Sequence, residues 1–143
     1  MKAIGDILKG KTEEEIKSSL ENTDLDPNKL LYQFSRMGFL LGVKKALEMG
    51  ANVHANDDYA LQLASGNGHL PVVEFLLKNG ANVHVYNDYA LRWASKRGHT
   101  NIVEILLKNG ADVNAYNGEP IQSALKHGHK DIVKLLKKYM YNE

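Results

Sequence analysis

A repeat of 30 residues runs through most of this 143-residue chain. Residues 51–80 and 81–110 are identical at 19 of 30 positions without a gap, and residues 111–140 continue in the same frame. Residues 21–50 follow the pattern more loosely, through matching hydrophobic, serine and glycine positions. A fixed period of this length predicts a repeat architecture, in which one small supersecondary unit is stacked several times.

Each unit reads as two short helices separated by a glycine. Ala60, Leu61 and Ala64 have helical spacing, and their small size predicts a thin first helix that lies close to its neighbours. Gly68 ends this helix, and the apolar positions of Val72–Leu77 form one face of a second helix. Two helices this short cannot bury their apolar faces alone, so the pattern predicts an all-α solenoid whose core forms between neighbouring units.

Both ends of the array are expected to act as caps of one single domain, residues 1–143. Residues 1–22 carry a weaker copy of the pattern and are predicted to form a divergent N-terminal pair of capping helices. Residues 111–143 are predicted to be a C-terminal capping repeat, because their second helix ends in lysines. Between the caps lie the repeats 23–50, 51–80 and 81–110.

The units resemble ankyrin repeats, whose pattern runs T-P-L-H-x-A-A-x-x-G-H-x-x-(I/V)-V-x-x-L-L-x-x-G-A-(D/N)-V-N. From Tyr89 to Asn114 this chain reads Y-A-L-R-W-A-S-K-R-G-H-T-N-I-V-E-I-L-L-K-N-G-A-D-V-N. The resemblance covers about residues 23–140 and implies stacked helix-turn-helix units with short hairpin or loop connections. The period is 30 where the family has about 33, so the projecting β-hairpin is expected to be shortened. This short unit is similar to the ankyrin arrays of giant amoeba-infecting DNA viruses.

The resemblance implies a non-catalytic scaffold that binds a partner protein through its concave groove and the ridge of loops. Positions that differ between repeats are candidates for that surface, because positions that only hold the stack should stay alike. Tyrosine, tryptophan and arginine are also the residue types that dominate binding hot spots. The candidate partner-binding residues are Asn56, Asp57, Tyr86, Arg92, Trp93, Lys96, Arg97, Tyr116 and Lys126.

Two of these candidates have an alternative structural role. Trp93 is equally well interpreted as part of the core, and Arg92 occupies the place where the family's histidine often forms hydrogen bonds between repeats. Other functions also stay open for the whole chain: an adaptor that recruits a partner to other machinery, or a structural protein that associates with itself.

Residues Gly5–Thr12 match the phosphate-binding pattern G-x-x-x-x-G-K-[ST] letter for letter. Such a loop follows a buried strand and leads into a helix whose N-terminus holds the phosphates. Only four residues precede the motif here, and the rest of the chain is committed to repeats. We therefore expect no nucleotide at this segment.

No metal, cofactor or catalytic residue is expected. His69, His99 and His129 recur every 30 residues, and in a stack they would lie roughly 8–10 Å apart. One zinc ion needs all its ligands at about 2.0–2.1 Å, so these histidines are expected instead to fix the turn between the two helices. Packing likewise accounts for the recurrent serines Ser35, Ser65 and Ser95.

Asn114 is a candidate for modification. Leu106 followed by Asp112-Val113-Asn114 resembles the ankyrin segment that asparaginyl hydroxylases modify in some family members. His54 and His84 occupy the same position in the two preceding repeats.

The composition predicts an intracellular, cytoplasmic protein, with a host cell as one setting. A net charge of +1 argues against a general partner among nucleic acids or anionic membranes. No apolar run approaches the roughly 18 residues that cross a bilayer, and residues 1–12 are too polar for a secretory signal. The absence of cysteine excludes disulfides. A monomer that binds another protein is the expected form.

Overall fold

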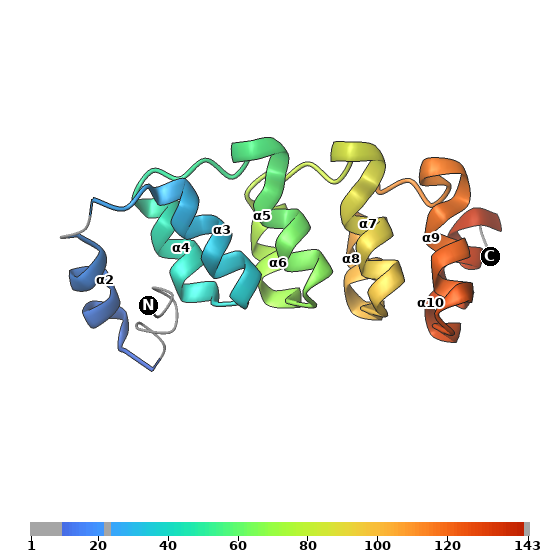
Figure 1. Ribbon diagram of the computed structural model, residues 1–143, viewed down its shortest axis with the longest axis horizontal. Coiled ribbons are helices and arrows are strands. Elements are labelled where there is room, and N and C mark those ends of the chain that lie inside the picture. The colour runs from blue at the N-terminus through green and yellow to red at the C-terminus, as the bar shows by residue number, and fades with distance from the viewer. Residues whose placement is uncertain (1–9, 22–23, 142–143) are drawn as a thin grey trace.

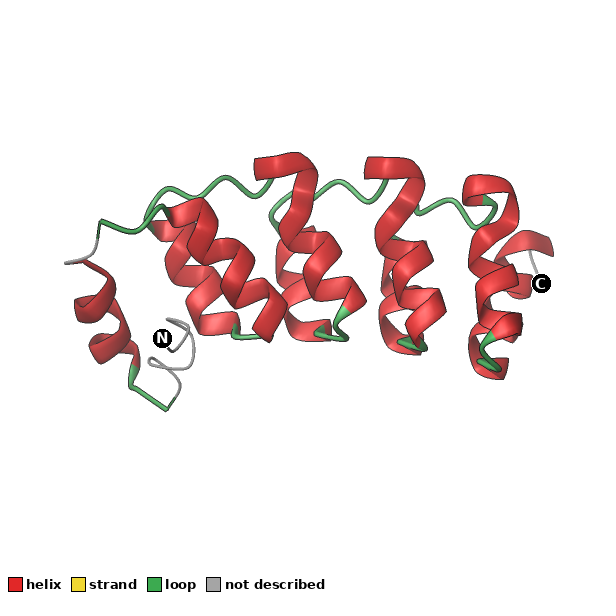
Figure 2. Ribbon diagram, in the orientation of Figure 1, coloured by secondary structure: helices red, strands yellow, loops and turns green. Residues whose placement is uncertain are grey.

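The chain folds into a row of antiparallel helix pairs in the computed structural model, which describes residues 10–21 and 24–141 (Figure 1). A single helix, α2 (Glu13–Glu21), comes first. The four pairs that follow are α3 (Pro27–Met37) with α4 (Leu40–Glu48), α5 (Ala55–Gly66) with α6 (Leu70–Lys78), α7 (Val85–Arg97) with α8 (Thr100–Lys108), and α9 (Ala115–Lys126) with α10 (Lys130–Tyr141). The described residues contain no strand, so loops alone connect the pairs (Figure 2). The prediction of an all-α solenoid is confirmed.

The helices form two rows. The first helices of the pairs, α3, α5, α7 and α9, contact one another more extensively than the second helices α4, α6, α8 and α10 do. Small buried residues such as Ala60, Ala64, Ala90 and Ala94 allow this close approach. A stack curves toward the side on which its units lie closer together, so the row of first helices faces the concave side.

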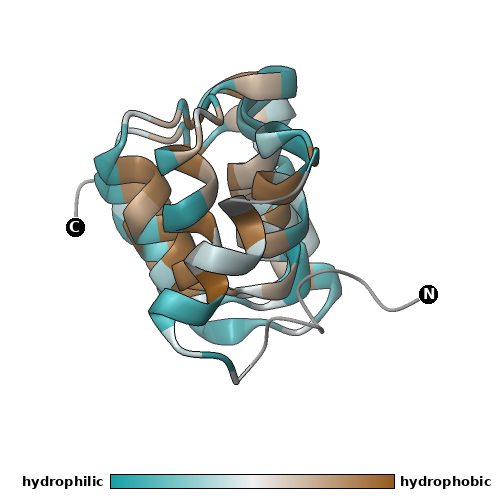
Figure 3. Ribbon diagram, turned by 90° about the vertical axis from the view of Figure 1, so that its left-hand side faces the viewer, coloured by the Kyte–Doolittle hydropathy of each residue, from teal (hydrophilic) through white to brown (hydrophobic). Residues whose placement is uncertain are grey.

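The hydrophobic core runs without a break between the two rows (Figure 3). Val43, Val73 and Val103 occupy the same position in successive second helices, and each is completely buried. A buried aliphatic side chain contributes roughly 1.5–3 kcal/mol. Because each such side chain also covers the apolar side chains of the neighbouring repeat, the stability of one repeat depends on the repeats beside it.

Histidines tie each repeat to the one before it. The Nε2–H groups of His69, His99 and His129 donate to main-chain carbonyls at the end of the preceding first helix, at 2.8, 3.1 and 2.9 Å. Each ring also lies against a glycine of that preceding repeat, and a Cβ on Gly38 would come within 2.3 Å of His69. The histidines thus have a structural role at a turn between helices, as expected, but the turn that their side chains contact is that of the preceding repeat.

A one-turn left-handed helix stands where the family has its hairpin. Three successive residues have positive φ in each of three repeats: 56–58, 86–88 and 116–118. This conformation costs roughly 1–2 kcal/mol for most L-residues and is visited routinely only by Gly, Asn and Asp, which supply most of these positions. The hairpin was expected to be shortened, and among the described residues the left-handed turn replaces it entirely.

Long polar side chains brace these left-handed turns. Gln62 Nε2 donates to the carbonyl of Asp57 at 2.8 Å, and Gln122 Nε2 donates to the carbonyl of Asn117 at 3.2 Å. Arg92 occupies the same position in the repeat between them and donates to the Asn87 carbonyl at 3.0 Å. Each bond satisfies a carbonyl that the left-handed turn takes out of the regular helical pattern.

A second set of polar side chains links each repeat to the next one. The side-chain oxygens of Asn28, Asp58 and Asp88 accept the backbone N–H 24 residues further along, at 2.8, 2.9 and 2.6 Å. Both aspartates are only 4% exposed, and the imidazoles of His54 and His84 contact the same two carboxylates. We call these three residues the acceptor column. Gly118 holds its fourth place, so the last repeat has no such acceptor, which supports its predicted role as a cap.

At the other end, α2 packs on the first repeat. Ile16 and Leu20 are buried, and Lys45 of α4 forms ion pairs with Glu13 and Glu48 at 3.1 and 3.2 Å. The hydrogen bonds to Glu13 and then to Glu48 raise the pKa of Lys45. The other helix of the predicted N-terminal capping pair lies outside the described residues.

The serine column leaves three buried hydroxyls without a hydrogen-bond partner among the described residues: Ser35, Ser65 and Ser95. We expect Ser65→Ala to raise the free energy of unfolding by about 1 kcal/mol, because it removes an unpaired polar group and alanine favours helix. Urea unfolding followed by circular dichroism measures this. Ser123→Ala on α9 is the control for helix propensity alone, since Ser123 is only half-buried. A Ser65→Ala gain no larger than that of the control would show that the buried hydroxyl carries no penalty.

Candidate functional site

The predicted partner-binding residues all lie on α5, α7 and α9, but the structure divides them into two groups. Asn56, Asp57, Tyr86 and Tyr116 belong to the left-handed turns at the start of these helices, which we call the ridge. Lys96, Arg97 and Lys126 lie at the ends of α7 and α9, which we call the basic edge. Arg92 and Trp93 lie between the two groups.

The ridge exposes two tyrosines in fixed positions. Tyr86 is 58% exposed and Tyr116 is 60% exposed. The hydroxyl of Tyr86 donates to Asp57 Oδ2 at 2.8 Å; this hydrogen bond and the negative charge of Asp57 raise the pKa of Tyr86. The guanidinium of Arg92 lies 4.7 Å from the centre of the Tyr116 ring. Each ring is therefore held by a neighbouring repeat while much of its surface faces solvent.

Arg92 braces the stack. Its side chain is only 13% exposed and pairs with Glu119 of the next repeat, Nη1 to Oε2, at 2.9 Å. Nη2 donates to the carbonyl of Tyr86 at 2.7 Å, and the guanidinium also lies 5.2 Å from the ring of Tyr89. Of the two roles that the sequence left open for Arg92, the geometry supports the structural one.

Trp93 fills space left by a glycine in the preceding repeat. A Cβ on Gly66 would come within 2.2 Å of the indole, which is half-buried and packs against Tyr89 with ring centres 5.5 Å apart. Arg36, Lys96 and Lys126 occupy the place of Gly66 in the other repeats. This variation between repeats reflects packing, so Trp93 belongs partly to the stack and partly to the concave surface.

The basic edge carries exposed cations without an ion-pair partner among the described residues. Lys96, Arg97 and Lys126 are exposed, and none forms an ion pair with any described residue. Arg97 stacks on the face of Trp93 at 5.2 Å, which fixes its direction beside the indole. His127 follows Lys126, and its ring stacks on that of His129 with centres 6.2 Å apart.

The first repeat contains a hollow that was not predicted from the sequence. It measures about 350 Å³, and we call it the tyrosine pocket because Tyr32 and Tyr59 meet there edge to face at 5.3 Å. Burial, and next the charge of Asp26, raise the pKa of Tyr32. The remaining lining residues are Leu25, Lys29, Leu30, Gln33 and Arg36. The recurrence of tyrosine at Tyr59 and Tyr89 was the signal that could have pointed to it.

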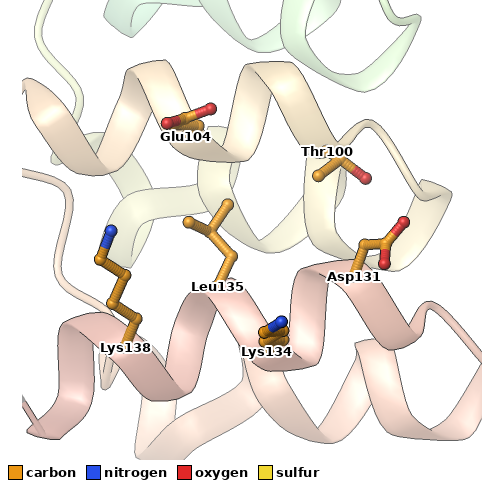
Figure 4. A pocket seen from close by; sticks show the side chains of 6 residues that line it. All are labelled: Thr100, Glu104, Asp131, Lys134, Leu135 and Lys138. Atoms are coloured by element: carbon orange, nitrogen blue, oxygen red, sulfur yellow. The ribbon is translucent and has the colours of Figure 1, made fainter. Parts of the chain in front are cut away.

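A larger hollow of about 490 Å³ lies between α8 and α10, in the row of second helices (Figure 4). Leu135 points between the two helices, and the charged side chains around it have both signs. They are Glu104, Asp131, Lys134 and Lys138, together with Thr100. None of the predicted site residues lines this hollow.

The phosphate-loop motif is described only from Gly10 onward, and Gly5–Lys9 lie outside the described residues. Thr12 Oγ1 accepts the backbone N–H of Glu15 at 3.2 Å and so caps α2. Glu13, Glu14 and Glu15 occupy the first turn of that helix, and their charges oppose a phosphate at its N-terminus. Helix capping explains this part of the motif.

The described residues also bear on the expectations about metal ions, membranes and modification. These contain no cluster of three or more side chains suited to hold a metal ion. None of their helices is long and apolar enough to cross a membrane. Asn114 is exposed in the connection before α9, where its backbone N–H donates to Asp112 Oδ1 at 2.9 Å. Its hydroxylation stays a prediction.

Comparison with known proteins agrees with the repeat architecture. A family model for ankyrin repeats, which spans three copies, matches residues 29–117 and 61–142. A search among curated proteins found no match. The two matches to the family model together cover most of the chain and include all four helix pairs except the first residues of α3. The chain therefore belongs to the ankyrin-repeat family.

Proposed function

We propose that this protein is a non-catalytic scaffold that binds a partner protein through its concave face and ridge. Ankyrin repeats generally mediate interactions between proteins, and the observation that carries the proposal here is the pair of exposed ridge tyrosines. Tyr86 and Tyr116 present more than half of their surface to solvent while their neighbours hold them in place. Aromatic rings fixed before binding lose little conformational freedom on contact, which favours affinity.

Capture from cell lysate with three baits tests the proposal. The baits are the wild type, Tyr86→Ala/Tyr116→Ala, and the control Tyr141→Ala, which removes a tyrosine that is 64% exposed on α10. Arg92 is left intact because it braces the stack. We expect a protein that wild type and control retain alike and that the ridge variant binds at least about thirtyfold more weakly.

Two other results would count against the proposal. Equal capture by all three baits would place the binding surface away from the ridge. If no bait captures a protein while light scattering shows dimers or larger species, the chain is a self-associating structural protein. An adaptor role would require that the captured partner be joined to a second protein at another surface.

We further propose the setting in which the scaffold acts: a monomer in the cytoplasm, with a host cell as one such environment. The 30-residue period supports this proposal only through its similarity to the arrays of giant amoeba-infecting DNA viruses. Hydroxylation of Asn114 is proposed on its exposure and its sequence context.

A further inference from the structure

Charge is distributed unevenly across the concave side. Residues 81–141 contain nine lysines and arginines against five aspartates and glutamates. On the row of first helices, the basic edge collects Lys96, Arg97 and Lys126 at the ends of α7 and α9, whereas Asp57 and Glu119 lie near the starts of α5 and α9. A ligand that crosses α7 and α9 therefore meets exposed positive charge at the ends of these helices and Glu119 near the start of α9.

The cations of the basic edge, like the lysines of α10, form no ion pair with a described residue, whereas three other cations of the stack do. Lys45, Arg92 and Lys108 each pair with a glutamate of the chain, at 3.1, 2.9 and 3.3 Å. Lys96, Arg97 and Lys126 have no such partner among the described residues, and all three lie at the ends of the adjacent helices α7 and α9. Part of their effect is to complement the helix dipoles. That effect does not require three cations on two adjacent helices, beside a half-buried indole.

We propose that the partner presents an extended acidic segment to the concave face, with carboxylates on the basic edge and one apolar side chain in the tyrosine pocket. This inference rests on the proposed function and names the chemistry of its ligand. Arg97 is already oriented by Trp93, so a carboxylate that pairs with it also gains a neighbouring aromatic surface. The tyrosine pocket lies on the same row of helices and has Lys29 and Arg36 at its border.

The repeat spacing sets the spacing of the ligand. Neighbouring helices pack about 10 Å apart, and an extended chain advances about 3.3 Å per residue. One repeat therefore corresponds to about three residues of ligand. Carboxylates that reach Lys96 and Lys126 should lie about three residues apart. The apolar residue should lie about six positions from the carboxylate at Lys96, on the side away from the other carboxylate, because the pocket is two repeats from Lys96.

Polyphosphate ligands fit this face less well. A nucleic acid or a lipid surface offers negative charge throughout, and it would bring phosphates toward Asp26, Asp57 and Glu119 as well as toward the basic edge. A flat bilayer also cannot follow a concave surface. A peptide can place its carboxylates on one side of the groove and keep uncharged residues on the other.

Selection from a displayed library of random twelve-residue peptides tests the inference. The full chain is the bait, and each enriched peptide is then synthesised and titrated by fluorescence anisotropy. We expect peptides with a net negative charge, two carboxylates three positions apart, and a bulky apolar residue about six positions from the nearer carboxylate. Lys96→Glu/Arg97→Glu/Lys126→Glu should weaken their binding at least about tenfold. Lys134→Glu/Lys137→Glu/Lys138→Glu on α10 makes the same change in net charge on exposed lysines and should leave binding within about twofold.

Each other outcome overturns the inference in a distinct way. Neutral or basic peptides that lose affinity in the ridge variant Tyr86→Ala/Tyr116→Ala would refute the acidic ligand and leave the proposed function standing. An equal loss in both charge-reversal variants would show bulk attraction without a site. Stronger binding to single-stranded DNA or to phosphatidylserine vesicles than to any peptide, lost in the basic-edge variant, would assign the edge to phosphate. A library without any enriched peptide would refute the extended acidic segment and leave the proposed function to the capture experiment. Lys96→Gln/Lys126→Gln keeps Arg97 on Trp93 and serves as the second variant if the triple reversal unfolds.

Discussion

Asp58→Ala is expected to lower the free energy of unfolding by about 3 kcal/mol. The substitution removes the acceptor that joins the second repeat to the third and leaves the N–H of Asn82 without its partner, at a cost of about 2 kcal/mol. Alanine also tolerates the φ of 56° at this position less well than aspartate does, which adds about 1 kcal/mol. Urea denaturation of the whole chain, followed by circular dichroism, gives the difference.

Asp57→Ala is the matched control, because Asp57 precedes Asp58 and has nearly the same φ, 54°. It shares the backbone penalty but is exposed, and its carboxylate accepts only the surface hydrogen bond from Tyr86. We therefore expect Asp57→Ala to cost about 2 kcal/mol less than Asp58→Ala. Asp58→Asn should recover most of the loss, since Asn28 performs the same role in the first repeat. Equal losses at positions 57 and 58 would mean that the link between repeats contributes nothing.

Gly66→Ala is expected to destabilise the protein by about 2 kcal/mol, although the same change in a helix ordinarily stabilises by up to about 1 kcal/mol. The added methyl group would lie 2.2–2.5 Å from three carbon atoms of the Trp93 indole. The ring also contacts Tyr89 and Arg97, so a displacement of the indole would disturb those contacts. Thermal and urea unfolding both measure the effect.

A double-mutant cycle with Trp93→Leu separates this clash from other effects of alanine. Leucine is the residue that the second repeat carries at the equivalent position, Leu63, so it suits the fold. In that background Gly66→Ala should become neutral or stabilising, which gives a coupling energy of about 2–3 kcal/mol. Coupling near zero would show that Trp93 does not depend on the glycine. If Trp93→Leu binds peptides as well as the wild type does, the indole is not part of the binding surface on the concave side.

The period and its apolar positions were enough to predict the fold, because the repeated Val and Leu positions leave few other ways to bury them. The capping role of the last repeat stays a prediction, which the lysines at its end and the glycine at position 118 support. The left-handed turns were not foreseen, since tyrosine rarely adopts the positive φ of Tyr86 and Tyr116, and the side chains that brace these turns, Arg92 and Gln122, come later in the chain. A loss of three residues predicts a shorter connection but does not specify its conformation.

Comparison between repeats was a weaker guide to the site. It singled out Arg92 and Trp93 because their positions vary, yet packing accounts for much of this variation: Arg92 meets Glu119, and Trp93 fills the space left by Gly66. Tyr86, Tyr116 and the basic edge remain exposed as a binding surface requires. The tyrosine pocket was missed because it combines residues from the first repeat with Tyr59 of the next, and no single column contains it.

The acceptor column has a consequence for how such an array changes in length. Each interior unit of 30 residues brings one side-chain acceptor for the unit after it and one backbone donor for the unit before it. A gene segment that encodes one interior unit can therefore be duplicated or deleted, and every remaining link still finds a partner. The unit with Gly118 lacks the acceptor, so a copy of it placed in the middle would leave one junction unlinked. The acceptor column itself therefore sets no copy number between Asn28 and Gly118, whereas pairs such as Gly66 with Trp93 fit only one particular neighbour.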